Sequence, residues 1–306
     1  MATHSTAPAT NYRGIILAGG SGTRLHPVTQ AVCKQLLPVY DKPMVYYPLS
    51  TLMLAGIREI LIISTPLDLP RFRSLLGTGE QWGLELSYAE QSEPRGLADA
   101  FNVGADYLQG HGCVMVLGDN IFFADGLSSK MRSAIANNEG ATLFSYPVSD
   151  PERFGVVVLD DNGQPLDLIE KPDPAPSNLA VTGLYIYGPD VVEQTRELQP
   201  STRGELEITD LNRRYLGQGR LRLEALRRGT AWLDTGTHDA LLEASQFVQT
   251  IQHRQGLIIA SPEEIAWRMD WISRPALLEL ARGLSASHYQ EYLIALASGS
   301  DHHAGI

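Results

Sequence analysis

The chain has 306 residues, 43% of them hydrophobic, and a formal net charge of -11. Its length suffices for a full hydrophobic core, and its acidity argues against nucleic acid as a partner, because nucleic-acid binders usually display a basic surface. No apolar run reaches the ~18 residues of a membrane-spanning helix, and the leader MATHSTAPAT lacks the apolar segment of a signal peptide.

Short apolar runs alternate with helix-like segments in the first half of the chain, which predicts an α/β fold. Such continuous apolar strands are typical of parallel sheets that are buried on both faces. We therefore expect a mostly parallel mixed sheet flanked by helices. The predicted strands are Gly14–Ala18, Glu59–Ser64, Leu84–Tyr88 and Cys113–Leu117, and the predicted helices are Tyr47–Gly56 and Leu97–Leu108.

Antiparallel additions are expected after residue 140. Val156–Leu159 and Leu166–Glu170 flank a turn that contains Asn162 and Gly163, a pattern that predicts a β-hairpin. Leu179–Tyr187 predicts another strand. From residue 238 onward helical spacing dominates, with prolines at the start of the helices expected at 262–269 and 275–284. The predicted organisation is a flexible tail at 1–12, a core at 13–237, a helical C-terminal extension at 238–298 and a disordered tail at 299–306.

A glycine-rich segment, Leu17–Leu25, follows the first predicted strand. Glycine lets backbone amides approach a polyphosphate without an intervening Cβ, and successive N–H groups form a nest for anions. The segment has neither the Gly-Lys-Ser/Thr of a Walker A motif nor the third glycine of the dinucleotide fingerprint. A tight turn without a ligand is the alternative, but Arg24 and Lys34 add positive charge beside it and favour a phosphate site.

Two aspartates end apolar stretches. Asp119 follows the strand Cys113–Leu117, and Asp234 closes the stretch that begins at Ala231. Ligands of open α/β sheets bind beyond the carboxyl ends of the strands, and Mg²⁺ is usually held by one or two carboxylates together with substrate phosphates. Either aspartate alone would more simply be a loop or cap residue. With the glycine-rich segment, the pair predicts a Mg²⁺ site.

The tripeptide Glu170-Lys171-Pro172 closes the second strand of the predicted hairpin. Pro172 is expected to keep Lys171 extended and so to aim its ammonium. Lysine binds phosphate as a point charge, and a glutamate accepts hydrogen bonds from sugar hydroxyls. The alternative is an exposed pair of opposite charges at a strand end.

Six motifs occur in order between about residues 13 and 272: GIILAGGSGTRL (14–25), KQLLPVYDKPM (34–44), LGDNIF (117–122), EKP (170–172), RGELEITDLN (203–212) and GTAWLDTGT (229–237). Together they resemble the glucose-1-phosphate thymidylyltransferases, a family of sugar-1-phosphate nucleotidyltransferases. The resemblance implies a Rossmann-like nucleotidyltransferase fold. It also implies Mg²⁺-assisted, in-line transfer of a thymidylyl group from dTTP to glucose-1-phosphate, which gives dTDP-glucose and pyrophosphate as a first step towards dTDP-deoxysugars such as dTDP-rhamnose.

The same resemblance implies roles for individual residues and a homotetramer built as a dimer of dimers. The catalytic cations would be Arg24, Lys34 and Lys171, and the Mg²⁺ ligands would be Asp119 and Asp234. The nucleotide would contact Gly19, Gly20, Ser21, Gly22, Thr23, Gln35, Gln91 and Gly96. The sugar phosphate would contact Gly155, Glu170, Lys171 and Val181. The chain departs from the family's common pattern at Arg95, where an aspartate is usual, and at Phe154, where a tyrosine is usual.

Two other functions fit the same motifs. One is the same chemistry with UTP or another sugar-1-phosphate. The other is a non-catalytic sensor of sugar nucleotides, which Asp119, Lys171 and Asp234 disfavour because a sensor needs neither metal nor acceptor groups. The two cysteines, Cys33 and Cys113, are too few for a disulfide framework, and we expect them to be reduced in a cytoplasmic protein.

Overall fold

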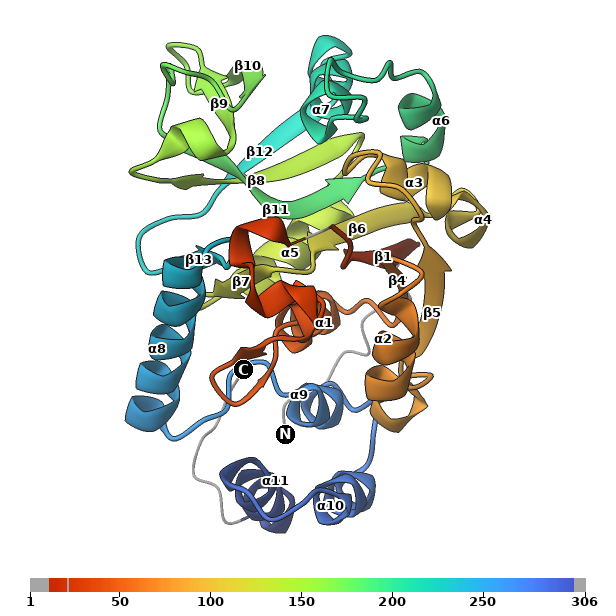
Figure 1. The fold of residues 1–306 in the computed structure, drawn as a ribbon, viewed down its shortest axis with the longest axis vertical. Coiled ribbons are helices and arrows are strands. Elements are labelled where there is room, and N and C mark those ends of the chain that lie inside the picture. Colours follow the sequence, from red (N-terminus) through yellow and green to blue (C-terminus); the bar gives the residue numbers. More distant parts are fainter. Residues whose placement is uncertain (1–10, 21, 300–306) are drawn as a thin grey trace.

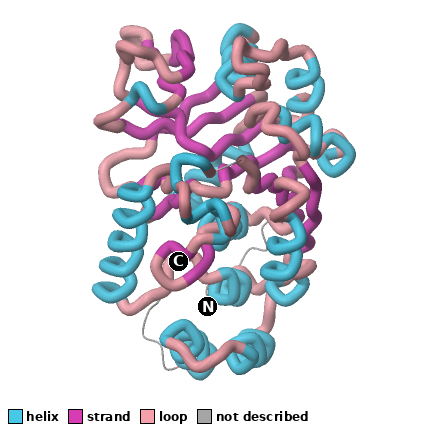
Figure 2. The backbone as a smooth tube through the Cα atoms, in the orientation of Figure 1, coloured by secondary structure: helices cyan, strands magenta, loops and turns pink. Residues whose placement is uncertain are grey.

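The computed structural model describes residues 11–20 and 22–299. Within these residues, nine strands form one sheet with helices on both faces (Figures 1 and 2). The strand order is β10-β9-β11-β6-β1-β4-β5, and β8 joins β12 to β11. The strands are β1 (Tyr12–Leu17), β4 (Glu59–Ser64), β5 (Glu85–Glu90), β6 (Gly112–Leu117), β8 (Ala141–Pro147), β9 (Gly155–Leu159), β10 (Pro165–Glu170), β11 (Leu179–Tyr187) and β12 (Leu221–Ala225).

Strand β1 lies in the middle of the parallel part of this sheet. It pairs in parallel with β4 on one side and with β6 on the other, and β5 extends the parallel set beyond β4. Strand β11 runs antiparallel to β6, and β9 and β10 form the expected antiparallel hairpin. The predicted mostly parallel mixed sheet is therefore confirmed, and the segment after β1 leaves from a central strand.

Two small sheets lie outside the large one. Strand β7 (Asn120–Phe123) pairs antiparallel with β13 (Ala231–Asp234), and β2 (Pro38–Val39) pairs with β3 (Lys42–Pro43). The α-helices are α1 (Tyr46–Leu54), α2 (Leu69–Leu76), α3 (Asp99–Val103), α4 (Ala105–Leu108), α5 (Leu127–Ala136), α6 (Val191–Arg196), α7 (Ile208–Gly217), α8 (His238–Gln255), α9 (Pro262–Arg268), α10 (Arg274–Gly283) and α11 (His288–Ser298). Short 3-10 turns occupy Thr23–Leu25, Val28–Gln30, Lys34–Leu36, Glu80–Trp82 and Pro151–Arg153.

The prediction of one continuous helix over Leu97–Leu108 is wrong, because the helix is interrupted at Gly104. The ψ of Gly104 is 6°, which departs from the helical value. A Cβ on Gly104 would lie 3.1 Å from the Ala100 carbonyl oxygen and 3.2 Å from the Ile15 side chain. The lack of a side chain thus lets this segment approach β1 closely, and the chain forms the two short helices α3 and α4.

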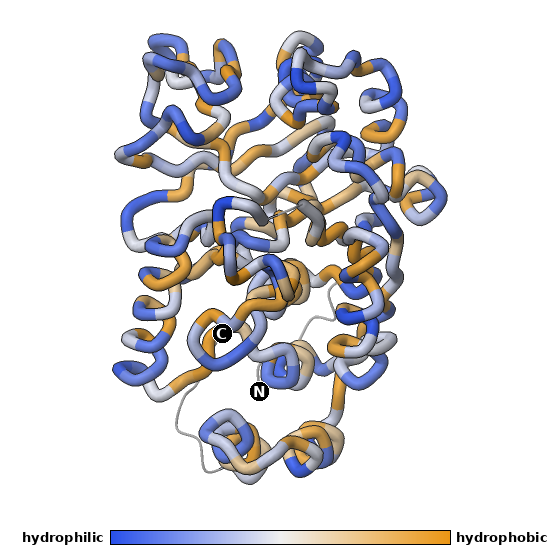
Figure 3. Tube along the Cα trace, viewed as in Figure 1, coloured by the Kyte–Doolittle hydropathy of each residue, from blue (hydrophilic) through white to orange (hydrophobic). Residues whose placement is uncertain are grey.

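The hydrophobic core fills both faces of the sheet, because successive residues of a strand point to opposite sides. On β1, Ile16 belongs to the cluster beneath α1, α2 and α5, and Ile15 belongs to the cluster on the other face, with α3 and α7. Both side chains are completely buried. Figure 3 shows hydrophobic residues concentrated along the central strands and hydrophilic ones on the outer turns.

The predicted helices after residue 238 are confirmed. Helix α8 runs along one side of the molecule, α9 packs against α1, and α10 and α11 pair at the end opposite the β9–β10 hairpin (Figure 1). On α8, Val248 is buried, whereas Leu242 is 58% exposed. Among the described helices, none is long and apolar enough to span a membrane.

Candidate active site

A cleft of about 770 Å³ opens beside the carboxyl end of β1 and shares residues with a smaller cavity of about 270 Å³. Each predicted site residue that the structure describes lines one of these two spaces. The larger cleft is lined by Gly19, Gly20, Thr23, Arg24, Gln35, Gln91, Gly96, Asp119, Gly155, Glu170, Lys171, Val181 and Asp234. The smaller cavity adds Gly22 and Lys34. Ser21 lies outside the described residues.

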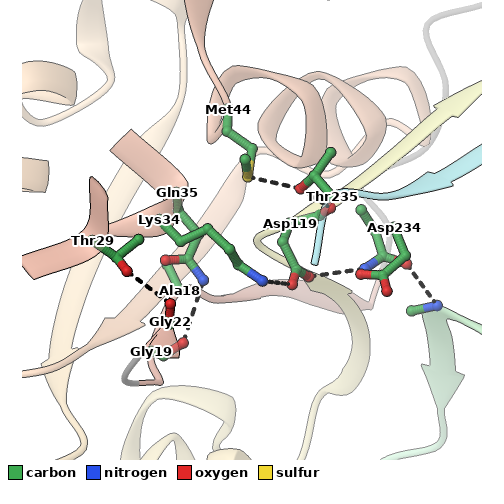
Figure 4. A network of polar contacts seen from close by, with 12 residues as sticks. Ala18, Gly19, Gly22, Thr29, Lys34, Gln35, Met44, Asp119, Asp234 and Thr235 are labelled. Atoms are coloured by element: carbon green, nitrogen blue, oxygen red, sulfur yellow. Dashed lines mark hydrogen bonds and ion pairs between the residues drawn. The ribbon is translucent and has the colours of Figure 1, made fainter. Parts of the chain in front are cut away.

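The glycine-rich segment is held in a curved form at the edge of both cavities. Gly20 and Gly22 have φ values of 101° and 58°, a left-handed region that glycine enters at little cost. The Thr29 hydroxyl donates to the Gly22 carbonyl at 2.7 Å, and the Gln35 amide donates to the Gly19 carbonyl at 3.3 Å (Figure 4). These bonds fix the segment at two of its carbonyl oxygens.

The two predicted metal ligands lie side by side because two strands far apart in the sequence pair. The register of β13 and β7 sets Asp234 opposite Asn120, and Asp119 is the residue just before Asn120. The Lys34 ammonium pairs with the Asp119 carboxylate (Figure 4). On the other side, the Arg153 guanidinium lies 3.6 Å from Asp234 Oδ2.

The two carboxylates have opposite pKa shifts. Burial alone would raise the pKa of Asp119, but the charge and hydrogen bond of Lys34 and the amide of Asn120 outweigh it and hold this pKa below its ordinary value. The pKa of Asp234 is raised, chiefly by burial and then by the neighbouring charge of Asp119. The site therefore concentrates negative charge that only partly finds compensation within the protein.

The oxygens of Asp119 and Asp234 fit a divalent cation that arrives together with a nucleotide. Among the described residues, no group of three or more His, Cys, Asp or Glu side chains could hold a metal by itself. A two-carboxylate set is the kind that Mg²⁺ completes with water and substrate phosphates. Asn120 supports Asp119: its amide donates to Asp119 Oδ1 at 2.9 Å, while its oxygen accepts from the Trp232 indole at 2.6 Å.

Glu170 and Lys171 stand on the wall of the cleft formed by β9, β10 and α7. The Thr209 hydroxyl donates to Glu170 Oε2 at 2.6 Å, and Lys171 Nζ lies 3.2 Å from Glu170 Oε1. The Arg203 guanidinium is 3.8 Å from the same carboxylate. This wall thus presents two cations and a carboxylate to the cleft.

The expectation that Pro172 keeps Lys171 extended is wrong. Lys171 has a φ of 42°, in the left-handed region that non-glycine residues seldom adopt. Its backbone N–H donates to the Phe154 carbonyl at 3.0 Å, which continues the pairing of β9 with β10 beyond Glu170. The hydrogen bonding of the hairpin overrides the local preference that the proline imposes.

The segment around Gln91 and Gly96 forms another part of the cleft lining. The Gln91 amide donates to Asp99 Oδ2 at 3.1 Å and to the Gly96 carbonyl at 3.4 Å. Gly96, with a φ of 99°, lies so close to the backbone of Leu206 that a Cβ would be 2.3 Å from the Leu206 oxygen. The segment that carries Gln91 and Gly96 is thereby attached to the one that carries Arg203.

Sequence reasoning did not single out several cleft residues. The larger cleft is also lined by Asn120, Arg153, Arg203, Thr209 and Trp232. Arg203 and Thr209 belong to the RGELEITDLN motif and Trp232 to GTAWLDTGT, so the motifs contained a signal for them. Arg153 is the last residue of the turn Pro151–Arg153, which has no local feature of a site, and only its position beside Asp234 indicates a role.

The fold and the cleft define a class of nucleotide-transferring α/β enzymes, and a comparison with protein families agrees. Residues 13–251 match the nucleotidyl transferase family. Because this match spans most of the chain, the chain belongs to the nucleotidyl transferase family.

Curated relatives narrow the class. The chain is 57% identical over 288 residues to the glucose-1-phosphate thymidylyltransferase of Xanthomonas campestris pv. campestris, a match that covers 94% of this chain and 98% of the relative. It is 54% identical over 284 residues to the enzymes of that name from Neisseria meningitidis and Mycobacterium tuberculosis, with 93% of this chain covered in each and 99% and 98% of the relatives.

Solved structures agree with these relatives. A Bacillus anthracis structure assigned as a glucose-1-phosphate thymidylyltransferase, in complex with sucrose, superposes with a TM-score of 0.72 at 38% identity, over 77% of this chain and 94% of that one. A UDP-glucose pyrophosphorylase complexed with UDP-glucose superposes with a TM-score of 0.68 at 25% identity, over 78% and 98%.

Proposed function

We propose that this chain transfers a thymidylyl group from dTTP to glucose-1-phosphate and releases pyrophosphate, so that the product is dTDP-glucose. The observation that carries the proposal is the single cleft that joins a glycine-rich phosphate segment, two adjacent carboxylates and a wall with two cations. The identity of 54–57% to relatives named for this reaction supports the choice of substrates.

The chemistry needs no nucleophilic side chain, because a sugar-phosphate oxygen is already an anion. This oxygen attacks the α-phosphorus of dTTP in line, the bond to the β-phosphate oxygen breaks, and pyrophosphate leaves. The protein positions two anions that repel one another and neutralises their charge. Arg24 and Lys34 serve the nucleotide phosphates, Lys171 serves the acceptor phosphate, and Gln91 and Gly96 contact the base.

We further propose Mg²⁺ as the cofactor, held by Asp119 and Asp234. Bound there, it would supply electrostatic stabilisation of the charge that develops on the phosphate oxygens. The protein residues prepare this role: Asn120 orients Asp119, and Lys34 compensates its charge. Glu170, oriented by Thr209, and the backbone of Gly155 and Val181 face the sugar.

The proposal is tested by measuring pyrophosphate release with four nucleoside triphosphates and several sugar-1-phosphates. The expected result is fastest turnover with dTTP and glucose-1-phosphate, and none without a divalent cation. A preference for UTP or for another sugar phosphate would replace the substrates but keep the reaction. The UDP-glucose pyrophosphorylase that shares the fold makes UTP the first alternative to include. Failure with each pair would favour a sugar-nucleotide sensor.

The homotetramer implied by the resemblance also belongs to this proposal, and light scattering of the purified chain measures it directly. The two cysteines are buried and free, which suits the reducing conditions of the cytoplasm.

A further inference from the structure

The two candidate metal ligands, Asp119 and Asp234, are each faced by a basic side chain, and these two cations come from opposite sides. Lys34, beside the glycine-rich segment, pairs with Asp119. Arg153, on the turn before β9, approaches Asp234. Lys34 has a role in the proposed reaction, whereas Arg153 has none so far, although it lines the same cleft.

We propose that Arg153 is a further substrate-binding residue, which holds Asp234 in the ligand-free enzyme and contacts the acceptor's phosphate once a divalent cation occupies that carboxylate. This inference deepens the proposed function and rests on it. The ligand class is a phosphate monoester, for which the planar guanidinium can offer two parallel N–H donors.

The contacts of Arg153 suit a side chain that exchanges partners. Its Nη1 donates to Asp150 Oδ2 at 2.6 Å, a firm hydrogen bond within one turn. Its Nη2 lies 3.6 Å from Asp234 Oδ2, which is too long for a hydrogen bond and leaves only a charge interaction. Asp150 therefore anchors one side of the guanidinium, while the other side is paired with Asp234 through charge alone.

Lys171 and Arg203, the two cations on the cleft wall beside Glu170, are paired differently from Arg153. Lys171 lies 3.2 Å from Glu170, and Arg203 donates to Glu207 at 2.8 Å. Those carboxylates are not candidate metal ligands, so cation binding would leave their pairs in place. Arg153 is the one whose partner, Asp234, would be taken by the cation. Of these three basic residues, Arg153 is thus the one that loading of the site would release towards an incoming anion.

Loss of Arg153 should therefore change the affinities for the cation and for the sugar phosphate in opposite directions. Without Arg153, a divalent cation competes with one protein charge fewer at Asp234, where Lys34 and Arg24 remain, so the ligand-free enzyme should bind the cation more tightly. At the same time the acceptor phosphate loses a charged donor, so the enzyme should bind the sugar phosphate more weakly. A residue that only supported the local fold would weaken both.

The test compares Arg153→Gln and Arg153→Lys with the wild type, and with Arg213→Gln as a matched control. Arg213 is an exposed arginine on α7 that pairs with Asp167 and Asp210 and does not line the cleft. Calorimetry with Mn²⁺ alone measures cation binding, and steady-state kinetics measures KM for glucose-1-phosphate and for dTTP separately.

For Arg153→Gln we expect Mn²⁺ to bind about threefold or more tightly and KM for glucose-1-phosphate to rise about tenfold, the usual effect of losing a charged hydrogen bond. KM for dTTP should stay within about twofold. Arg153→Lys, which keeps the charge, should recover part of both effects, and Arg213→Gln should behave as wild type.

Two results would overturn the inference: unchanged or weaker Mn²⁺ binding in Arg153→Gln, or an unchanged KM for glucose-1-phosphate. Failure of the proposed function looks different, because the wild type itself would then not turn over dTTP and glucose-1-phosphate. In that event Mn²⁺ binding and direct titration with glucose-1-phosphate still decide the role of Arg153.

Discussion

Lys171 adopts a backbone conformation that its local sequence disfavours. Its left-handed backbone is unfavourable before proline, and a strained conformation of this kind persists where the surrounding structure over-determines it. The hydrogen bond from its N–H to the Phe154 carbonyl provides that constraint. The ammonium is therefore held at the cleft wall by the hairpin and not by Pro172.

The first prediction concerns Lys171. Lys171→Ala should raise KM for glucose-1-phosphate about tenfold or more, because a charged contact to the acceptor is lost, and should leave the Kd for dTTP near the wild-type value. Calorimetric dTTP titration and steady-state kinetics measure the two effects. A weakened dTTP Kd with a normal KM for sugar phosphate would reverse the assignment. Lys130→Ala, a change at a distant surface pair with Glu224, is the control.

The second prediction concerns the carboxylates. Asp119→Asn and Asp234→Asn keep the side-chain shape but remove the charge, so each should reduce kcat to below about a tenth of the wild type at saturating Mg²⁺. Circular dichroism and the thermal midpoint should confirm an intact fold. If either variant keeps more than this activity, that aspartate does not bind the metal.

At the scale of elements, two segments that we propose to serve different substrates are joined by their backbones. The Leu206 N–H donates to the Arg95 carbonyl at 2.7 Å, and the Ala98 N–H donates to the Leu206 carbonyl at 3.2 Å. Gly96 lies between these bonds. The part of the cleft proposed to bind the base is thus hydrogen-bonded to the segment that carries Arg203, which lies on the side proposed for the acceptor.

The third prediction uses this contact. Gly96→Ala should weaken dTTP binding and lower stability, because its Cβ would lie 2.3 Å from the Leu206 oxygen and would push the two segments apart. Gly163→Ala is the matched control: its φ is 76° and nothing lies within 4 Å of the added Cβ. The control should show only the strain of a left-handed residue, about 1–2 kcal/mol. Urea unfolding and dTTP titration compare the two variants. Equal dTTP affinities would contradict the proposal that contact with Leu206 positions Gly96 for the base.

At the scale of the whole molecule, the C-terminal helices reach back to the segment that follows Lys34 and Gln35. Lys42 on β3 is 4% exposed, and its Nζ lies 2.5 Å from Asp41 and 3.3 Å from Gln252 of α8. The same ammonium faces the rings of Tyr47 on α1 and Tyr289 on α11, at 5.2 and 5.8 Å. One buried cation therefore touches elements from both ends of the chain.

The fourth prediction follows from this burial. Lys42→Met should lower the free energy of unfolding by about 2 kcal/mol, because the Asp41 carboxylate loses its ion-pair partner and keeps only the hydrogen bond from Gln252. Lys130→Met, at an exposed pair, should change it by at most about 1 kcal/mol. Urea denaturation of both variants measures the difference. Equal losses would mean that Lys42 does not join the C-terminal helices to the core.

Sequence alone determined the features that depend on local pattern. The apolar runs predicted the parallel strands, because their period and composition reflect burial on both faces. The glycines and Arg24 predicted a phosphate site directly after β1, and Asp119 was placed at a strand end by the same kind of local pattern. The division of the chain at residue 237 into core and extension stays a prediction.

Only the tertiary structure decided which distant residues meet. Asp234 lies beside Asp119 because β13 pairs with β7 in one register, and a shift by one residue would turn the side chain to the other face. The same applies to Arg153 beside Asp234 and to the left-handed Lys171, where long-range hydrogen bonds outweigh the preference of a dipeptide. Such pairings join residues 81 and 115 positions apart, or set the hydrogen bonds of a hairpin against local preference, so no local pattern of the chain specifies them.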